Sequence, residues 1–74
     1  MEYYQRIRDL REDKDMNQTQ IAKYLGTSLT VYSRYERNER KLPIDHLKKL
    51  CYFYNISADY ILGFTNEPKP LPKK

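Results

Sequence analysis

The 74-residue sequence has one cysteine, Cys51, one histidine, His46, and no tryptophan. A single thiol cannot close an internal disulfide, and one thiol with one imidazole supplies too few ligands for a structural zinc site. Packing alone must therefore hold the fold. No uncharged stretch approaches the ~20 apolar residues that a membrane span requires. Early charges at Glu2, Arg6 and Arg8 also exclude a secretory signal, which favours an intracellular location.

The length of the chain allows one small domain, which buries too little surface to build a deep catalytic cleft. The sequence contains no nucleophile with a partner base, no glycine-rich phosphate loop and no cluster of metal ligands. His46 is best interpreted as a surface or capping residue, and Cys51 as a packing residue. The sequence therefore predicts a protein that is not an enzyme and has no metal or cofactor.

Basic residues outnumber acidic ones by 14 to 10, which gives a formal net charge of +4. Three lysines, Lys69, Lys73 and Lys74, lie near the C-terminus, so residues 1–63 carry 11 basic and 9 acidic side chains. So small an excess does not by itself indicate a polyanionic partner. The distribution of the charges must decide between nucleic-acid binding and a solvated surface.

Apolar residues recur at helical spacing in five segments, and cap and stop residues mark the ends of these segments. Asn17 and Ser28 suit helix N-caps, while Gly26 and Asn38 suit the left-handed backbone conformation that follows a helix. The expected helices cover residues 3–13, 18–25, 29–37, 44–54 and 58–62. Since no strand pattern appears, the sequence predicts an all-α, compact five-helix bundle.

Residues 65–74 differ in composition from the rest of the chain, because prolines stand at positions 68, 70 and 72. Alternating prolines forbid a helix and favour an extended backbone. We expect residues 1–64 to form the folded domain. Residues 65–74 are expected to form a flexible Pro/Lys-rich tail, which either steers the protein toward DNA or, the favoured interpretation, is a solvated end that aids solubility.

The second and third expected helices are joined by a short turn at residues 26–28. On the third helix, the apolar side chains Val31, Tyr32 and Tyr35 share one face. The opposite face is polar and basic and carries Thr30, Ser33, Arg34 and Arg37. Two helices joined by a tight turn, the second with a polar and basic outer face, are typical of a helix-turn-helix that reads double-stranded DNA.

The run Asn-Gln-Thr-Gln-Ile-Ala-Lys-Tyr-Leu-Gly-Thr-Ser at residues 17–28, with residues 31–37 and 57–63, resembles the Cro/C1-type (XRE) helix-turn-helix repressors. The resemblance covers residues 5–64. It implies a lambda-repressor-like five-helix fold whose third helix enters the DNA major groove. It also implies transcriptional regulation, by a repressor that binds a near-palindromic operator as a dimer. A cytoplasmic, nucleoid-associated protein of bacterial or phage origin is the corresponding expectation.

Site residues follow from the resemblance, position by position. The positions that face base edges are occupied by Leu29, Thr30, Ser33 and Arg34. The positions that contact DNA phosphates are occupied by Gln18, Thr19, Ser28, Arg37, Asn38, Arg40 and Lys41. Arg11 and Glu36 occupy positions that form a structural salt bridge between the first and third helices. Leu29 stands where many relatives carry a hydrogen-bonding side chain, so the operator sequence does not follow from theirs.

The expected partners are double-stranded DNA and a second copy of the chain, with no membrane and no small-molecule ligand. The resemblance and leftover apolar surface place the contact between copies at Tyr60, Ile61 and Phe64. A second class of function stays open, namely a protein-interaction module such as an antitoxin or a phage-encoded modulator. The apolar Leu29 and the low charge of residues 1–63 favour that alternative.

Overall fold

The computed structural model describes residues 1–72, which form five helices and, within that range, no strand. The helices are α1 (Tyr3–Asp13), α2 (Gln18–Leu25), α3 (Leu29–Glu36), α4 (Ile44–Tyr54) and α5 (Ala58–Leu62). The predicted all-α five-helix bundle is confirmed. The third helix ends one residue earlier than predicted, because Arg37 is its C-cap.

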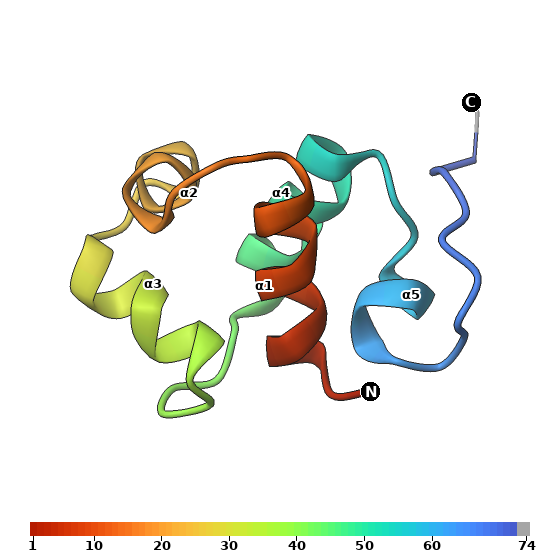
Figure 1. Ribbon diagram of the computed structural model, residues 1–74, viewed down its shortest axis with the longest axis horizontal. Coiled ribbons are helices and arrows are strands. Elements are labelled where there is room, and N and C mark those ends of the chain that lie inside the picture. Colours follow the sequence, from red (N-terminus) through yellow and green to blue (C-terminus); the bar gives the residue numbers. More distant parts are fainter. Residues whose placement is uncertain (73–74) are drawn as a thin grey trace.

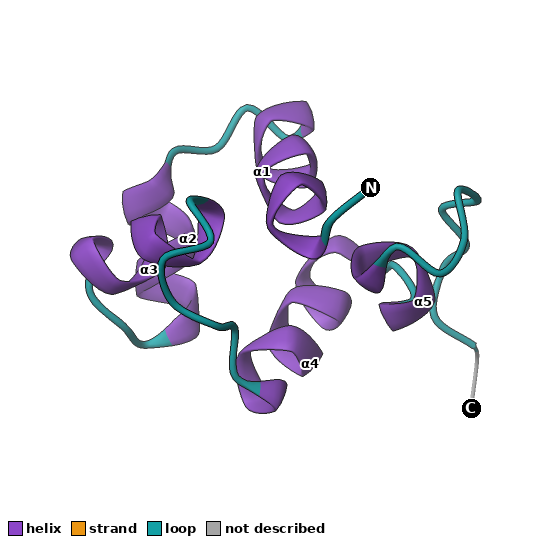
Figure 2. Ribbon diagram, turned by 90° about the horizontal axis from the view of Figure 1, so that it is seen from below, coloured by secondary structure: helices purple, strands orange, loops and turns teal. Residues whose placement is uncertain are grey.

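The helices are arranged so that α2 and α3 occupy one end of the molecule. Figure 1 and Figure 2 show α5 and the C-terminal segment at the other end, with α1 and α4 between the two ends. α2 packs on α3, and α1 contacts both α3 and α5. This arrangement leaves the outer side of α3 free of other helices.

Local hydrogen bonds fix the helix ends at the residues that the sequence indicates. Asn17 Oδ1 accepts from the Gln20 amide and Gln20 Oε1 accepts from the Asn17 amide, both at 2.8 Å, which forms a capping box. Ser28 Oγ accepts from the backbone amide of the third residue of α3 at 3.1 Å. Gly26 and Asn38 follow α2 and α3 with φ of +75° and +58°.

The core takes side chains from all five helices. Its fully buried large side chains are Ile7, Ile21, Leu25, Tyr32, Tyr35, Leu50 and Ile61. The expectation that Ile61 contacts a second copy is wrong, because Ile61 lies on the side of α5 that packs on α1 and α4 and is 0 % exposed. Tyr60 is half-buried and Phe64 is exposed, so these two remain available for such a contact.

The segment after α5 has no helix or strand up to Pro72, as its prolines predict. Its backbone returns to the body of the molecule, because the Ser57 amide donates to the Lys69 carbonyl at 2.9 Å. Leu71 packs against the core. The tail expected from the sequence also includes Lys73 and Lys74, which lie outside the described residues.

Candidate nucleic-acid interface

The turn between α2 and α3 sets the direction of the second helix. The Thr27 amide donates to the Ala22 carbonyl at 2.9 Å, which closes the last turn of α2, and Ser28 caps α3 immediately afterwards. The helices α2 and α3 then pack against each other, and Leu25 of α2 and Tyr32 of α3 are both buried. The turn and this packing together hold α3 at one end of the molecule (Figure 1), and Thr30 and Arg34, on its polar side, are exposed.

The outer face of α3 carries the side chains predicted to read bases. Leu29, which is 47 % exposed, Thr30 and Arg34 are open to solvent, and Ser33 is half-buried. Ser33 Oγ donates to the Thr30 carbonyl at 3.1 Å, so its remaining capacity is that of an acceptor. Within residues 1–72, Arg34 forms no ion pair. Its guanidinium is therefore free to donate to a ligand.

A buried ion pair joins α3 to α1 and α2. Arg11 Nε donates to Glu36 Oε2 at 2.7 Å, and Arg11 Nη2 donates to Glu36 Oε1 at 3.0 Å. Gln18 Nε2 donates to the same Oε1 at 3.0 Å, and Arg11 Nη1 donates to the Met16 carbonyl at 2.9 Å. The salt bridge expected between the first and third helices is therefore present. The Met16 contact was not predicted, because no sequence pattern marks a backbone acceptor in a loop.

The environment of this pair keeps both groups charged. Burial opposes the ionisation of Glu36, but hydrogen bonds from Arg11 and Gln18 outweigh that effect and lower the pKa of the carboxyl. The hydrogen bond to Glu36 in turn raises the pKa of the Arg11 guanidinium. With both oxygens occupied, Glu36 is suited to fix the position of α3 rather than to transfer protons.

The loop that follows α3 turns back on the helix and presents cations beside it. The Glu39 and Arg40 amides donate to the Arg34 carbonyl at 2.9 and 3.3 Å. Arg37 Nε lies 3.2 Å from Glu39 Oε2 in an exposed pair, so its charge is partly offset. Arg40 and Lys41 are exposed and form no ion pair in the described part of the chain.

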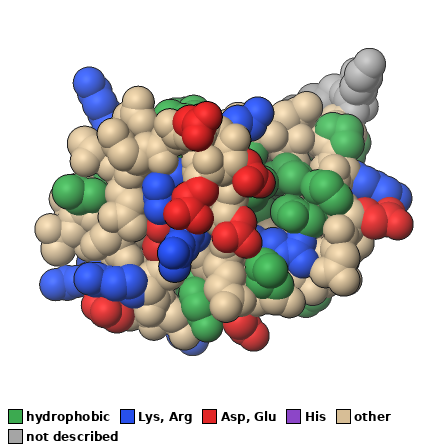
Figure 3. Space-filling view, viewed as in Figure 1, with side chains coloured by type: hydrophobic (Ala, Val, Ile, Leu, Met, Phe, Trp, Pro, Cys, Tyr) green, Lys and Arg blue, Asp and Glu red, His purple; other side chains and the backbone are tan. Residues whose placement is uncertain are grey.

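The remaining predicted contacts, Thr19 and Ser28, are exposed at the starts of α2 and α3. Figure 3 shows basic side chains extending from the end of the molecule that α3 forms, with an acidic side chain beside them, and a denser mixture of acidic and basic side chains over α1. The predicted DNA contacts on α2, α3 and the following loop thus gather at one end of the molecule. A mixed-charge surface such as that of α1 offers no comparable attraction for a polyanion.

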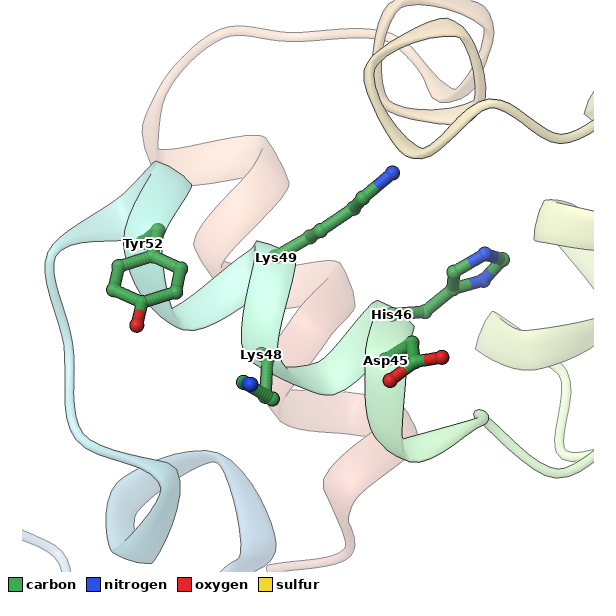
Figure 4. A pocket seen from close by; sticks show the side chains of 5 residues that line it. All are labelled: Asp45, His46, Lys48, Lys49 and Tyr52. Carbon is green, nitrogen blue, oxygen red and sulfur yellow. The ribbon is translucent and has the colours of Figure 1, made fainter.

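An open hollow on α4 has a volume of about 480 Å³. It is lined by Asp45, His46, Lys48, Lys49 and Tyr52 (Figure 4). Two of these side chains connect neighbouring helices: His46 Nδ1 lies 3.3 Å from the Tyr35 hydroxyl, and Lys49 Nζ donates to the Leu25 carbonyl at 3.5 Å. None of the predicted DNA contacts lines this hollow, so we assign its residues to helix packing.

Two other classes of site would need features that residues 1–72 do not have. In that range, no three His, Cys, Asp or Glu side chains come together as a metal site would require. Every helix there is too short or too polar to pass through a lipid bilayer.

Known proteins that are similar to this chain contain a helix-turn-helix. A helix-turn-helix family model matches residues 7–61 of the chain. The chain is 40 % identical over 68 residues to an uncharacterized HTH-type transcriptional regulator of Bacillus subtilis, YobD, covering 92 % of this chain and 61 % of YobD. It is 33 % identical over 51 residues to the cryptic phage CTXphi transcriptional repressor RstR of Vibrio cholerae, covering 69 % of this chain and 46 % of RstR. The chain thus spans less than two thirds of the length of these curated relatives.

Solved structures with the same fold include two of the P22 c2 repressor. The crystal structure of the P22 c2 repressor protein in complex with a synthetic operator matches with a TM-score of 0.76 and 29 % identity, covering 84 % of this chain and 94 % of that chain. The nuclear magnetic resonance structure of the DNA-binding domain of the P22 c2 repressor gives a TM-score of 0.75 at 29 % identity, covering 84 % of this chain and 82 % of that one. The predicted lambda-repressor-like fold is confirmed.

Proposed function

Because the chain belongs to the Cro/C1-type helix-turn-helix family, we propose that it regulates transcription by inserting α3 into the major groove of double-stranded DNA. The observation that carries the proposal is the exposed polar face of α3, which the buried Arg11–Glu36 pair holds outward. The proposed activity is binding rather than catalysis, in the cytoplasm and at the nucleoid. Similarity to two proteins named as repressors favours repression.

Base reading is assigned to the four side chains on the outer side of α3. The Arg34 guanidinium can donate two hydrogen bonds to guanine O6 and N7, a pairing worth roughly 1–3 kcal/mol of discrimination. Thr30 and Leu29 offer apolar contact to a thymine methyl group. Ser33, whose proton is directed to the Thr30 carbonyl, offers an acceptor to the amino group of adenine or cytosine.

Phosphate contacts are assigned to the starts of α2 and α3 and to the loop after α3. The residues are Gln18, Thr19, Ser28, Arg37, Asn38, Arg40 and Lys41. Gln18 keeps one amide proton free after its bond to Glu36, so it can position α3 and still donate to a phosphate. Contacts of this kind add affinity without sequence choice. Each phosphate contact made by a cation, here Arg37, Arg40 or Lys41, makes the slope of log affinity against log salt more negative by about 0.9.

A second copy of the chain is the proposed partner on the operator, with half-sites about 34 Å apart. Exposed apolar side chains around the end of α5 support this proposal, since Phe64 is 78 % exposed and Leu62 is 39 % exposed. Leu62 also lines a cavity of about 220 Å³ together with Ile44, which is 71 % exposed. We therefore place the contact on these three residues, with Tyr60 at its edge and without the buried Ile61.

The proposal can be tested by selecting binding sites from a random pool of double-stranded DNA and sequencing them. Wild type, Arg34→Ala and Arg8→Ala are compared over a range of salt concentrations. Arg8 is a matched control, because it is an exposed arginine on α1 whose Nε lies 3.7 Å from Glu12 Oε1. We expect a near-palindromic site for wild type and Arg8→Ala, and loss of a guanine preference in Arg34→Ala.

Each part of the proposal can fail separately. Weak, salt-sensitive binding with no enriched sequence would contradict sequence-specific regulation and would favour the protein-interaction module instead. Enrichment of a single half-site without its inverted repeat would contradict only the proposed dimer and would leave sequence-specific binding in place. An unchanged guanine preference in Arg34→Ala would remove Arg34 from the base-reading set.

A further inference from the structure

The C-terminal segment is seated on α4 and α5. The Ser57 amide, at the start of α5, donates to the Lys69 carbonyl at 2.9 Å. Two residues later, Leu71 packs on the core and closes one side of a cavity of about 200 Å³. The cavity is lined by Leu47, Lys48, Cys51, Tyr52, Ala58 and Leu71. Residues 65–71 therefore make a backbone contact and an apolar contact with the same pair of helices.

A buried charge holds the start of this segment. Arg6 on α1 is only 4 % exposed, and it has no carboxylate partner among the described residues. Its guanidinium donates to the Thr65 carbonyl at 3.3 Å and to Asn66 Oδ1 at 2.7 Å, and it lies 4.0 Å from the centre of the Tyr60 ring. A buried cation without these acceptors would be costly, so burial of Arg6 depends on the seated segment.

Backbone and side-chain contacts fix the chain on both sides of Phe64, which is the most exposed of the large apolar side chains. On its N-terminal side, the Phe64 amide donates to the Asp59 carbonyl at 2.9 Å, after Gly63 has ended α5 with φ of +85°. On its C-terminal side, the contacts of Arg6 hold the two residues that follow. Figure 1 and Figure 2 show this segment running beside α5, at the end opposite α2 and α3.

We propose that the groove between α4 and α5 is a recognition site for an extended, proline-flanked leucine segment, and that the chain's own residues 65–71 occupy it. We call residues 65–71 the strap. The sequence Pro70-Leu71-Pro72 supplies a stiff extended backbone around one apolar side chain, which suits a shallow groove beside the exposed Tyr52. Because the strap is tethered a few residues from the groove, its high effective concentration favours it over any free peptide.

The seated strap has a consequence for assembly, which rests on the dimer contact proposed above. With the strap seated, Phe64 is held between two fixed points and is ready to meet a second copy. With the strap released, Phe64 lies on a mobile segment. Pairing must then fix that segment, and the entropy lost in doing so lowers the affinity between copies. Occupancy of the groove therefore controls how firmly the chain pairs on a two-fold operator.

The single cysteine gives a direct measure of strap seating, because Cys51 lines the same cavity as Leu71 and is 6 % exposed. We would measure the rate at which Ellman's reagent labels Cys51 in the full chain for wild type, Leu71→Ala, Leu71→Ile and Lys69→Ala. Lys69→Ala is the matched control, since its side chain is 74 % exposed and only its backbone contacts α5. The helical signal in circular dichroism checks that each variant is folded.

We expect Leu71→Ala to be labelled about tenfold faster than wild type, which corresponds to about 1.4 kcal/mol of lost seating energy. Leu71→Ile and Lys69→Ala should react at the wild-type rate. Asn66→Ala should also accelerate labelling, because it removes the closest acceptor of Arg6. If folded wild type and folded Leu71→Ala are labelled at equal rates, the proposal that the strap occupies the groove is overturned.

The link to assembly is measured on the same variants by comparing their affinities for the full operator and for one half-site. The full-site advantage should fall in Leu71→Ala and in Phe64→Ala, with half-site affinity unchanged. Suppose that Leu71→Ala is labelled faster than wild type and that Phe64→Ala loses the full-site advantage. If Leu71→Ala nevertheless keeps that advantage, the link between strap and assembly is overturned. If Phe64→Ala also keeps the advantage, the proposed dimer contact fails, while the labelling result stands independently.

Discussion

Replacing Glu36 by alanine removes the carboxylate that receives hydrogen bonds from both Arg11 and Gln18. The side chains of Arg11 and Glu36 are 13 % and 3 % exposed, so water cannot easily replace the lost partner. Arg11 would keep only the Met16 carbonyl, 2.9 Å from Nη1, as an acceptor. We expect a lower free energy of unfolding and a less firmly held α3.

The size of the effect follows from the burial of the pair. Removing one member of a buried ion pair costs roughly 3–5 kcal/mol, because the other charge is left without compensation. A domain of this length has a free energy of unfolding near the lower end of the usual 5–15 kcal/mol, so the loss is a large fraction of the total. At about 4–8 °C per kcal/mol for a small domain, the melting temperature should fall by at least about 12 °C.

Thermal and urea unfolding, followed by circular dichroism, would measure the loss. Glu12→Ala is the matched control, because the Arg8–Glu12 pair is exposed, with side chains 61 % and 53 % exposed, and should contribute no more than about 0.5 kcal/mol. The double variant Arg11→Met/Glu36→Leu should recover most of the stability, since neither charge remains buried.

Two results would refute this reasoning. A loss in Glu36→Ala no larger than that in Glu12→Ala would show that water compensates Arg11. A double variant that loses as much stability as the single variants Arg11→Met and Glu36→Leu lose together would show that the damage comes from lost packing. In that second case the network would still position α3, but an uncompensated charge would not explain the cost of removing Glu36.

Three further predictions concern pH and backbone conformation. The pKa of Glu36 is lowered in the folded state, so its ionised form stabilises the fold. This stabilisation is fully present above the ordinary pKa of 4.5 and is lost as the pH falls through the folded-state pKa. In urea unfolding, Glu36→Gln should lose less stability than wild type over that pH range. Gly63→Ala should lower the melting temperature more than Gly26→Ala does. Both have positive φ, which costs about 1–2 kcal/mol, but only at Gly63 does the new Cβ collide with backbone, the Met1 carbonyl. Asn38→Ala should cost about 1 kcal/mol in thermal unfolding and Asn38→Gly almost nothing, because φ is +58° there.

The helices and the outer face of α3 could be predicted because their signals are short in range. A capping box such as that of Asn17 and Gln20 joins residues three apart, and the apolar stripe that buries Tyr32 repeats every three or four residues. The exposure of Thr30 and Arg34 follows from the same stripe, since they lie opposite it. The assignment of these two residues to base reading stays a prediction, which the selection experiment tests.

The burial of Ile61 and Arg6 could not be predicted from such signals. Ile61 sits in a helix of five residues, too short for its periodicity to show which side faces the core. Arg6 looks like any charged residue on an amphipathic helix, and its partner Asn66 lies 60 residues away in the sequence. Only a contact formed by the folded chain explains why that arginine is inside.

The amino-acid sequence by itself determined the five helices, their order and the polar face of α3, because caps, stops and stripes act between neighbours along one helix. Only the tertiary structure decided that Arg6 is buried against Asn66 and that the proline-rich segment lies on α4 and α5. These contacts arise between groups far apart in the chain. Their energies depend on distance and burial, and folding alone sets both.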